Sequence, residues 1–313
     1  MSKYCFGVDV GGTTIKLGLF NNKGDMIDKW EILTNKENKG NNILSDISRT
    51  VRDRIKERKI EKEDVIGIGM GVPGPVDADG VVYKCVNLGW GVFNVRQVLE
   101  KLTNLTVKAG NDANVAALGE MWQGGGKGYK DVVLFTLGTG VGGGVILGGQ
   151  MVNGANGSAG ELGHMTIVLD EGENCNCGKT GCLETVASAT GIVRETKKYL
   201  EKSNEESVLR TSNRLSARVV FDAAKNGDKV AIKMVEQLGN HLGLATAHIA
   251  NVLNPEVFVI GGGVSKAGNI LIDVITKNFK KYAFHAVRDT EFRLATLEND
   301  AGMIGAAKLI LEN

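Results

Sequence analysis

Three short apolar segments of this chain each end in a glycine-rich turn, and this pattern constrains its fold more than any other feature. The turns read DVGGTTIK at 9–16, LGTGVGGG at 137–144 and GGGVS at 261–265. The first two are followed at once by another apolar run, which predicts a strand, a tight turn and a returning strand. The two strand–turn–strand units resemble each other weakly. We therefore expect a fold built from two related halves, with a domain boundary near Asn111.

The rest of the chain mixes short apolar runs with segments of helical spacing, which indicates an α/β protein. Besides the strands at 4–10, 15–20, 132–137 and 141–147, strands are expected at 26–33, 65–72, 105–109, 256–260 and 292–296. Helices are expected at 43–58, 94–102, 189–201, 217–225, 229–253, 270–284 and 301–311. A further helix should begin at Asn111 or Asp112, with an apolar face that includes Val115, Ala116, Leu118 and Met121.

The balance of charge disfavours several classes of partner. The chain has 313 residues, room for two domains, and its 37 Lys and Arg nearly cancel 36 Asp and Glu to leave a net charge of +1. Such a balance does not favour nucleic-acid binding. No apolar run is long enough to span a bilayer, and the opening MSKYCFGVDV lacks the regions of a signal peptide. We expect a cytoplasmic protein with no nucleic-acid or membrane partner.

The glycine turns suit phosphate binding, because backbone N–H groups at such turns can close around phosphate oxygens. Asp9 in the first turn can hold Mg²⁺ through water, and the threonine hydroxyls add donors. Taken alone, each turn is equally well explained as a ligand-free hairpin. Three such turns, in a chain with 43 glycines and 3 prolines, favour one nucleotide clamped by the two halves. The chain lacks the GxxxxGK[ST] pattern of a P-loop.

Asn111 and Asp112 stand where a predicted strand gives way to a helix. On spacing alone the pair is an ordinary helix cap. The functional alternative is a carboxylate that accepts a proton from a sugar hydroxyl as that oxygen attacks a phosphoryl group. Phosphoryl transfer depends mainly on positioning and charge neutralisation, with one base to orient the nucleophile.

Four potential metal ligands lie in the segment from Glu161 to Glu184, namely His164, Cys175, Cys177 and Cys182. One histidine and three cysteines make a tetrahedral set that suits structural Zn²⁺ with no open position. The alternative is three unrelated thiols, which the scarcity of cysteine elsewhere disfavours. The remaining two cysteines, Cys5 and Cys85, fall in strand-like runs and are expected in the core.

Together these motifs resemble the ROK family of sugar kinases and repressors, and within it the bacterial ATP-dependent glucokinases. The resemblance rests on DVGGTTIK, GVPGPVD, NDANVAALGE, TLGTGVGGGVILGGQMVNGANGSAGELGH, CNCGKTGCLE and GGGVS, and it covers nearly the whole chain. It implies an actin-like, ribonuclease H-like α/β fold of two domains around a central cleft. The smaller domain would span 1–111, joined by a C-terminal helix at about 300–313, and the larger 112–299 would carry the zinc loop.

The resemblance also implies a role for particular residues. Asp112 is the implied catalytic base, and the implied zinc ligands are His164, Cys175, Cys177 and Cys182. Residues implied to hold the sugar are Gly74, Asn111, Asp112, Glu161, His164 and Glu184. Residues implied to bind ATP are Asp9, Gly11, Gly12, Thr13, Thr14, Lys16, Gly138, Thr139, Gly140, Gly261, Gly262 and Gly263. His164 would bind zinc through one ring nitrogen and face the sugar with the other.

We therefore expect a glucokinase that uses ATP, Mg²⁺ and a structural Zn²⁺, and that forms a homodimer as members of the family often do. Other kinases of the family, acting on N-acetylmannosamine, allose or fructose, or using polyphosphate to phosphorylate glucose, are the alternatives. A sugar-sensing repressor of the same family is a further alternative. It would need a helix-turn-helix ahead of the first strand, and the strand expected from Tyr4 leaves no room for one.

Overall fold

The protein is described by a computed structural model that covers residues 3–83 and 85–312. The chain divides into two compact units. The first comprises Met1–Gly128, Gly144–Gly160 and Leu297–Asn313, and the second comprises Tyr129–Gly143 and Glu161–Thr296. The expected domain ranges 1–111 and 300–313 include Met1, Ser2, Lys84 and Asn313, which lie outside the described residues. A domain boundary at Asn111 stays a prediction, and the first unit also takes in 112–128 and 144–160.

The first unit is built on a five-stranded sheet with the order β3-β2-β1-β4-β7. Its strands are β1 Tyr4–Val10, β2 Thr14–Asn21, β3 Met26–Leu33, β4 Val65–Val72 and β7 Val107–Asn111. The hairpin of β1 and β2 is antiparallel, whereas β1, β4 and β7 run parallel. β4 is almost wholly buried and β3 alternates with exposed positions, as a central strand and an edge strand should.

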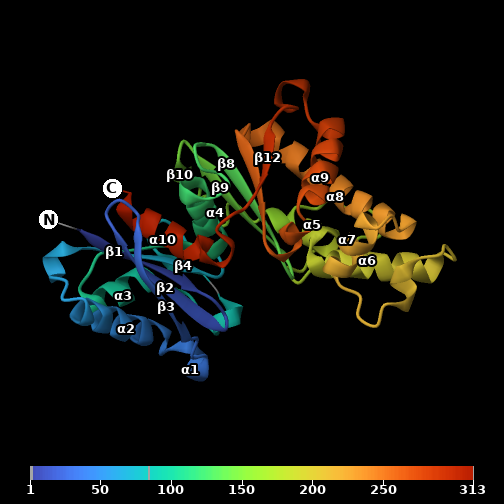
Figure 1. Ribbon diagram of the computed structural model, residues 1–313. Coiled ribbons are helices and arrows are strands. Elements are labelled where there is room, and N and C mark those ends of the chain that lie inside the picture. Colours follow the sequence, from blue (N-terminus) through green and yellow to red (C-terminus); the bar gives the residue numbers. More distant parts are fainter. Residues whose placement is uncertain (1–2, 84, 313) are drawn as a thin grey trace. The chain divides into compact units, whose positions relative to one another are not determined.

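Two helices pack closely on this sheet and on each other. The C-terminal helix α10 (Ala301–Leu311) contacts β1, β4 and α4 (Asp112–Gln123), as Figure 1 shows. The approach is so close that a Cβ on Gly69 would lie 1.7 Å from the carbonyl oxygen of Ala306. Glycine is therefore needed there to let the helix backbone reach the sheet. On α4 the buried alanine is Ala117, whereas Ala116, expected on the apolar face, is only half-buried.

The other side of the first unit carries α2 (Ile43–Glu57) and α3 (Val95–Thr103), which contact each other. Their apolar faces share one buried core with the sheet, through residues such as Ile47 and Leu99. A short left-handed turn, α1 (Glu37–Gly40), precedes α2, and a two-stranded ribbon, β5 (Val81–Val82) with β6 (Phe93–Asn94), precedes α3. The sequence did not predict α1 or this ribbon, because both are too short to show a period.

The second sheet has the order β10-β9-β8-β11-β12, the same order as the first with respect to position along the chain. Its strands are β8 Val132–Leu137, β9 Val141–Leu147, β10 Gln150–Met151, β11 Val257–Gly261 and β12 Glu291–Leu294. β8, β11 and β12 are parallel, and the last residues of β9 together with β10 are counted in the first unit. The two sheets therefore share one topology, in agreement with two related halves.

The helices of the second unit are α5 Leu183–Ala187, α6 Ala189–Lys202, α7 Ala217–Lys225, α8 Lys229–Leu253 and α9 Asn269–Tyr282. The long helix α8 contacts α5, α6, α7 and α9. Aromatic rings fill the space between β11, β12 and α9, where Phe258 stacks on Phe292 at 5.0 Å between ring centroids. None of the described helices has both the length and the apolar character that a membrane crossing requires.

Candidate functional site

The parallel strands of the first unit bring three of the expected motifs to one edge of its sheet. The first glycine turn follows β1, Gly74 follows β4, and Asn111 ends β7. In the register of the parallel ladders Asp9 pairs with Gly71, and Val72 pairs with Asn111. The carboxyl ends of parallel strands are where ligands bind in open α/β sheets. The motifs thus gather where the topology favours a ligand.

The first glycine turn is held by hydrogen bonds that leave part of its backbone available. The N–H of Gly11 donates to the carbonyl of Thr14 at 3.0 Å, closing the hairpin. Thr34, directly after β3, holds the turn by donating its N–H to the carbonyl of Thr13 at 2.9 Å and its hydroxyl to the carbonyl of Gly11 at 2.7 Å. In the described part of the chain no acceptor is recorded for the N–H groups of Gly12 and Thr13. Two adjacent donors are therefore free for an anion.

Asp9 and Lys16 face each other across the β1–β2 hairpin. Burial raises the pKa of Asp9, and the positive charge of Lys16 offsets part of that rise. The carboxyl group lies against the first turn of α10, since a Cβ on Gly302 would come within 2.7 Å of its carbon. Lys16 donates its ammonium to the carbonyl of Asn299 at 2.7 Å. Asp9 is thus a half-buried carboxyl group with one cationic neighbour, and its oxygens are of the kind that Mg²⁺ prefers as ligands.

Asn111 is a helix cap, as one of the two interpretations of its motif predicts. Its Oδ1 accepts hydrogen bonds from the N–H groups of Ala113 at 3.0 Å and Asn114 at 3.1 Å. Its Nδ2 donates to the carbonyl of Gly74 at 3.1 Å, which ties the turn after β4 to the start of α4. The side chain is buried, with 7% of its surface exposed. Contact between Asn111 and a sugar stays a prediction.

Asp112 is the first residue of α4 and is half-buried. One carboxylate oxygen accepts the N–H of Ala113 at 2.8 Å. The helix N-terminus stabilises this negative charge. Burial raises the pKa of the Cys85 thiol, and the negative charge of Asp112 adds to that rise. The carboxyl group of Asp112 thus lies at the N-terminus of α4, with one oxygen bound to the backbone of Ala113.

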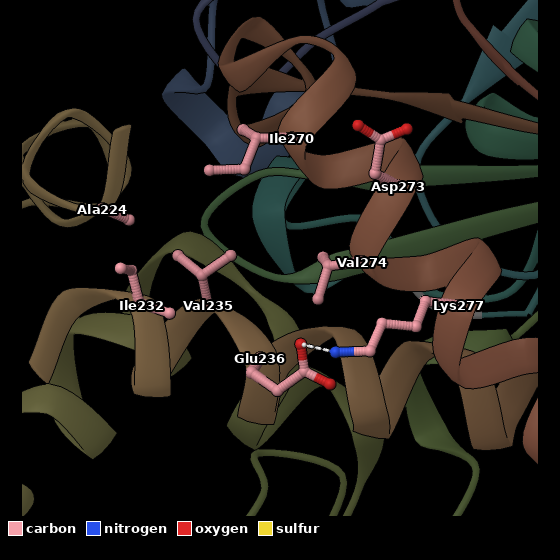
Figure 2. Close-up of a pocket in the computed structure, with 8 residues that line it drawn as sticks. All are labelled: Ala224, Ile232, Val235, Glu236, Ile270, Asp273, Val274 and Lys277. Atoms are coloured by element: carbon pink, nitrogen blue, oxygen red, sulfur yellow. Dashed lines mark hydrogen bonds and ion pairs between the residues drawn. The ribbon is translucent and has the colours of Figure 1, made fainter. Parts of the chain in front are cut away.

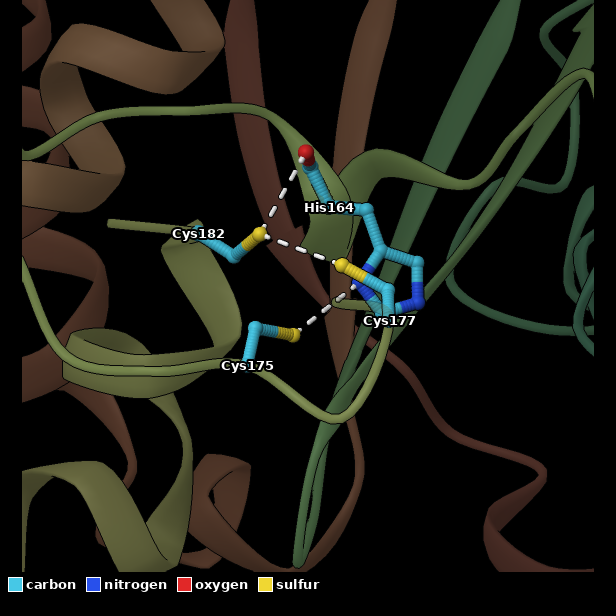
Figure 3. Close-up of side chains that lie close together, drawn as sticks. All are labelled: His164, Cys175, Cys177 and Cys182. Atoms are coloured by element: carbon cyan, nitrogen blue, oxygen red, sulfur yellow. Dashed lines mark hydrogen bonds between the residues drawn. The ribbon is translucent and has the colours of Figure 1, made fainter. Parts of the chain in front are cut away.

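The second unit brings together the four predicted metal ligands, and Figure 3 shows their side chains converging from a loop and a short helical turn. One ligand atom from each of His164, Cys175, Cys177 and Cys182 lies within 4.8 Å of all the others. Nδ1 of His164 is 3.5 Å from Sγ of Cys175, and the sulfurs of Cys177 and Cys182 are 3.6 Å apart. Tetrahedral zinc, with bonds of about 2.3 Å to sulfur and about 2.0 Å to nitrogen, separates its ligands by roughly 3.5–3.8 Å.

The pKa values of Cys177 and Cys182 in this cluster are shifted in opposite directions, and a bound cation would favour the thiolate form of both. Burial and the two neighbouring thiols raise the pKa of Cys182 to about 12. The pKa of Cys177 is lowered, chiefly because its sulfur accepts a hydrogen bond from the backbone at Lys179. Three crowded sulfurs do not ionise together without a positive charge among them. The donor set and its spacing therefore fit Zn²⁺, which would hold all three as thiolates.

Two carboxylates flank the metal cluster. Nε2 of His164, the ring nitrogen that does not face the sulfurs, lies 3.8 Å from the carboxylate of Glu161. Glu184 places one oxygen 3.8 Å from Sγ of Cys175 and accepts the N–H of Val141 with the other at 3.1 Å. The metal cluster is thereby joined through Glu184 to the second glycine turn. This geometry is compatible with the expectation that one ring nitrogen of His164 binds the metal while the other faces away from it.

The second and third glycine turns adjoin each other, because β8 and β11 are parallel neighbours. Gly262 has a φ of 82°, and a Cβ there would lie 2.6 Å from the backbone of Leu137, so the close approach requires glycine. Gly263 lines a cavity of about 300 Å³ with the start of α7, and Thr139 lines a groove of about 630 Å³ with α6 and the start of α7. Ala217 belongs to both.

A separate hollow of about 350 Å³ lies where α7, α8 and α9 meet. Figure 2 shows its apolar wall and the ion pair between Glu236 and Lys277, whose charged atoms are 3.1 Å apart. No residue of the expected site lines it. The glycine turns and the metal cluster therefore remain the candidate site.

Three polar side chains of the first unit, those of Asn114, Glu120 and Lys36, were not predicted from the sequence. Asn114 on α4 accepts the N–H of Val145 and donates to the carbonyl of Ala159. Glu120 is 1% exposed, and its two oxygens accept N–H groups of Gly125 and Leu297. Lys36 lies beside the first glycine turn. Asn114 and Glu120 could have been recognised from the sequence as polar residues on a mostly apolar helix, which need partners when buried. No sequence pattern marks Lys36 in this way.

Comparison with known proteins agrees with these observations. Residues 5–313 match the sequence profile of the ROK family. A glucokinase of Halalkalibacterium halodurans is 48% identical, over 98% of this chain and 95% of that protein. A glucokinase of Thermotoga maritima is 36% identical, over 98% and 96%. A crystal structure of a ROK family glucokinase from Streptomyces griseus with glucose and AMPPNP superposes with a TM-score of 0.75 at 32% identity, over 98% of each chain. The likeness confirms the expected actin-like α/β fold.

Proposed function

Because the chain belongs to the ROK family, we propose that it is a glucokinase, which transfers the γ-phosphate of ATP to the 6-hydroxyl of D-glucose and releases glucose 6-phosphate and ADP. One observation carries the proposal. A carboxylate at a helix N-terminus, Asp112, stands at the same sheet edge as a glycine turn with free N–H donors. That pairing of a base and a phosphate-binding turn is what phosphoryl transfer to a hydroxyl needs.

Asp112 is assigned the role of general base. Its carboxylate takes the proton from the 6-hydroxyl while that oxygen attacks the γ-phosphorus, and the bond from phosphorus to the β,γ-bridging oxygen of ATP breaks. The hydrogen bond from Ala113 holds one oxygen in place. The other oxygen is the one proposed to face the hydroxyl. Removing such a base lowers the rate of comparable reactions by about 10²-fold to 10⁴-fold.

The nucleotide is assigned to the glycine turns. In the first unit, the N–H groups of Gly12 and Thr13 are proposed to bind phosphate oxygens. In the second unit, the turn at 138–140 is assigned the same task, and the cavity beside Gly263 is assigned the adenine. The groove at Thr139 and that cavity share Ala217, which supports one extended ligand along this path. Mg²⁺ would be held near Asp9 and would neutralise phosphate charge.

The residues assigned to the sugar are Gly74, Asn111, Asp112, Glu161, His164 and Glu184. Zn²⁺ is proposed to be structural, because all four ligand positions of a tetrahedron are filled by protein groups and none remains for a substrate. Its task would be to fix the loop that carries Glu161 and His164. A cytoplasmic location and a homodimer belong to the proposal as well.

A coupled assay tests the proposal. ADP formation is measured with ATP against glucose, mannose, fructose, allose, N-acetylglucosamine and N-acetylmannosamine, and then with polyphosphate in place of ATP. We expect the highest kcat/KM with glucose and ATP. A clear preference for another sugar would move the assignment to one of the alternative kinases. Absence of turnover with every sugar, in protein that binds glucose, would favour the sugar-sensing alternative.

A further inference from the structure

Lys36 places a cation beside the first glycine turn. Its ammonium nitrogen lies 3.6 Å from the position that a Cβ on Gly12 would occupy. Among the described residues, no other heavy atom outside the turn's own neighbours lies within 4 Å of that position. A phosphate that lies on this open side of Gly12 would therefore meet the ammonium group.

The backbone around Lys36 is fixed on both sides. Before it, Thr34 makes two hydrogen bonds to the glycine turn, at 2.9 Å and 2.7 Å. After it, Asn38, Lys39 and Gly40 all have left-handed backbone angles, with φ of 51°, 59° and 69°. Strained conformations of this kind persist where the surrounding structure holds them, and they cluster at functional sites.

The left-handed turn is held against the loop before α3. The indole N–H of Trp90 donates to the carbonyl of Gly40 at 3.1 Å. A Cβ on Gly40 would lie 2.6 Å from the carbonyl oxygen of Leu88, so the two segments are in close contact. The segment that carries Lys36 is thus positioned by contacts on both sides, although its side chain is exposed.

The ammonium group of Lys36 is also available to bind an anion. The described residues include no ion-pair or hydrogen-bond partner for its side chain, whereas Lys16, the lysine of the glycine motif itself, donates to Asn299 and faces Asp9. A lysine ammonium is a compact point charge that binds phosphate without a fixed orientation. Of the two lysines near the turn, Lys36 is the one free to move onto a bound anion.

We propose that Lys36 binds the terminal phosphates of the nucleotide at the Gly12 turn and neutralises charge there during transfer. The inference rests on the proposed function and adds to it a catalytic residue that the glycine motif does not contain. Preorganised cations aimed at a transferring phosphoryl group contribute to the rate, because charge on its oxygens need not be solvated by water.

The test compares three variants. Lys36→Gln removes the charge, Lys36→Arg keeps it, and Lys23→Gln removes an exposed lysine of the β2–β3 turn as the control. We expect Lys36→Gln to lower kcat/KM for ATP about 10-fold to 100-fold, with Lys36→Arg recovering most of the loss. The KM for glucose should not change. Equal kcat/KM for ATP in Lys36→Gln and Lys23→Gln would overturn the proposal.

Calorimetry separates this proposal from the proposed function. ATP and adenosine are titrated into the wild-type protein and into Lys36→Gln. Urea unfolding first establishes that the two proteins are equally stable. Weaker binding of ATP with unchanged binding of adenosine supports a phosphate contact, even if no sugar were phosphorylated. Equal loss for both ligands, or no loss for either, contradicts it.

Discussion

Glu184 accepts a hydrogen bond from the N–H of Val141 at 3.1 Å, directly after the second glycine turn. Its other oxygen lies 3.8 Å from Sγ of Cys175, one of the four metal-ligand candidates. One carboxylate therefore touches both the metal cluster and the backbone that is assigned to phosphate. Loss of the proposed metal should disturb the turn proposed to bind phosphate as well as the residues proposed to bind the sugar.

Removal of a zinc ligand tests this connection. Cys177→Ser should lower the zinc content from about one ion per chain to near zero, because three ligands hold zinc far less tightly than four. Binding of ATP and of glucose should both weaken, since Glu184 loses one of its supports. Atomic absorption and calorimetry provide the readouts, and Cys5→Ala, which removes a buried thiol elsewhere, is the control. Zinc-free Cys177→Ser with wild-type ATP binding would disprove the connection.

Gly140→Ala tests the same relationship from the other side. A Cβ at Gly140 would lie 2.0 Å from the carboxylate of Glu184, so the carboxylate must move away from Val141. At Gly138 a Cβ would meet no heavy atom of the described residues within 4 Å, apart from those of its two chain neighbours. We expect Gly140→Ala to lower the thermal midpoint and to release zinc faster to a chelator. Gly138→Ala should leave both measurements unchanged, and identical behaviour of the two variants would contradict the structure.

Asp112→Asn should remove the base without disturbing the helix. The cap of α4 is provided by Asn111, so we expect an unchanged unfolding midpoint in urea. The kcat should fall about 10²-fold to 10⁴-fold, because the amide cannot take the proton. Asp79→Asn, in an exposed turn of the same unit, is the matched control. Near-normal turnover by Asp112→Asn would show that another group acts as the base.

Asn111→Ala should destabilise the first unit. The change removes the acceptor of two N–H groups and the donor to Gly74, which together are worth about 1–3 kcal/mol of unfolding free energy. Asn111→Asp keeps the acceptor and loses the donor, so its stability should lie between that of the wild type and that of Asn111→Ala. Urea unfolding measures all three proteins. A loss below about 0.5 kcal/mol for Asn111→Ala would mean that the cap contributes little.

The protein should lose stability in acid because of His241. Burial lowers its pKa from the ordinary value of 6.5, although the nearby Glu195 opposes the shift. Its Nε2 is buried and has no hydrogen-bond partner among the described residues. Below pH 6.5 the unfolded chain binds a proton that the folded chain does not, so the free energy of unfolding falls as the pH decreases. His241→Gln should flatten that fall between about pH 7.5 and pH 5.5 in urea titrations. An unchanged slope would exclude His241 as its source.

The structure agrees with the sequence most closely where a feature depends on local spacing. The helix Lys229–Leu253 and the strand Val65–Val72 begin and end where their periodicity predicts. Strand β7 instead runs from Val107 to Asn111, two residues later than expected at each end, because its parallel pairing with β4 extends that far. Pairing with a distant strand is a tertiary property, and local composition does not report it.

The sequence by itself determined the kinds of element, the glycine turns, the four candidate metal ligands and the family, because each of these depends on short spacings or on motifs. Only the tertiary structure placed Lys36 at Gly12, joined Asn111 to Gly74 across 37 positions, and joined Glu184 to Val141 across 43. The physical reason is that parallel pairing and chain reversal bring distant segments to one sheet edge. Contacts made there depend on the packing of the whole unit, and neighbouring residues in the sequence do not encode them.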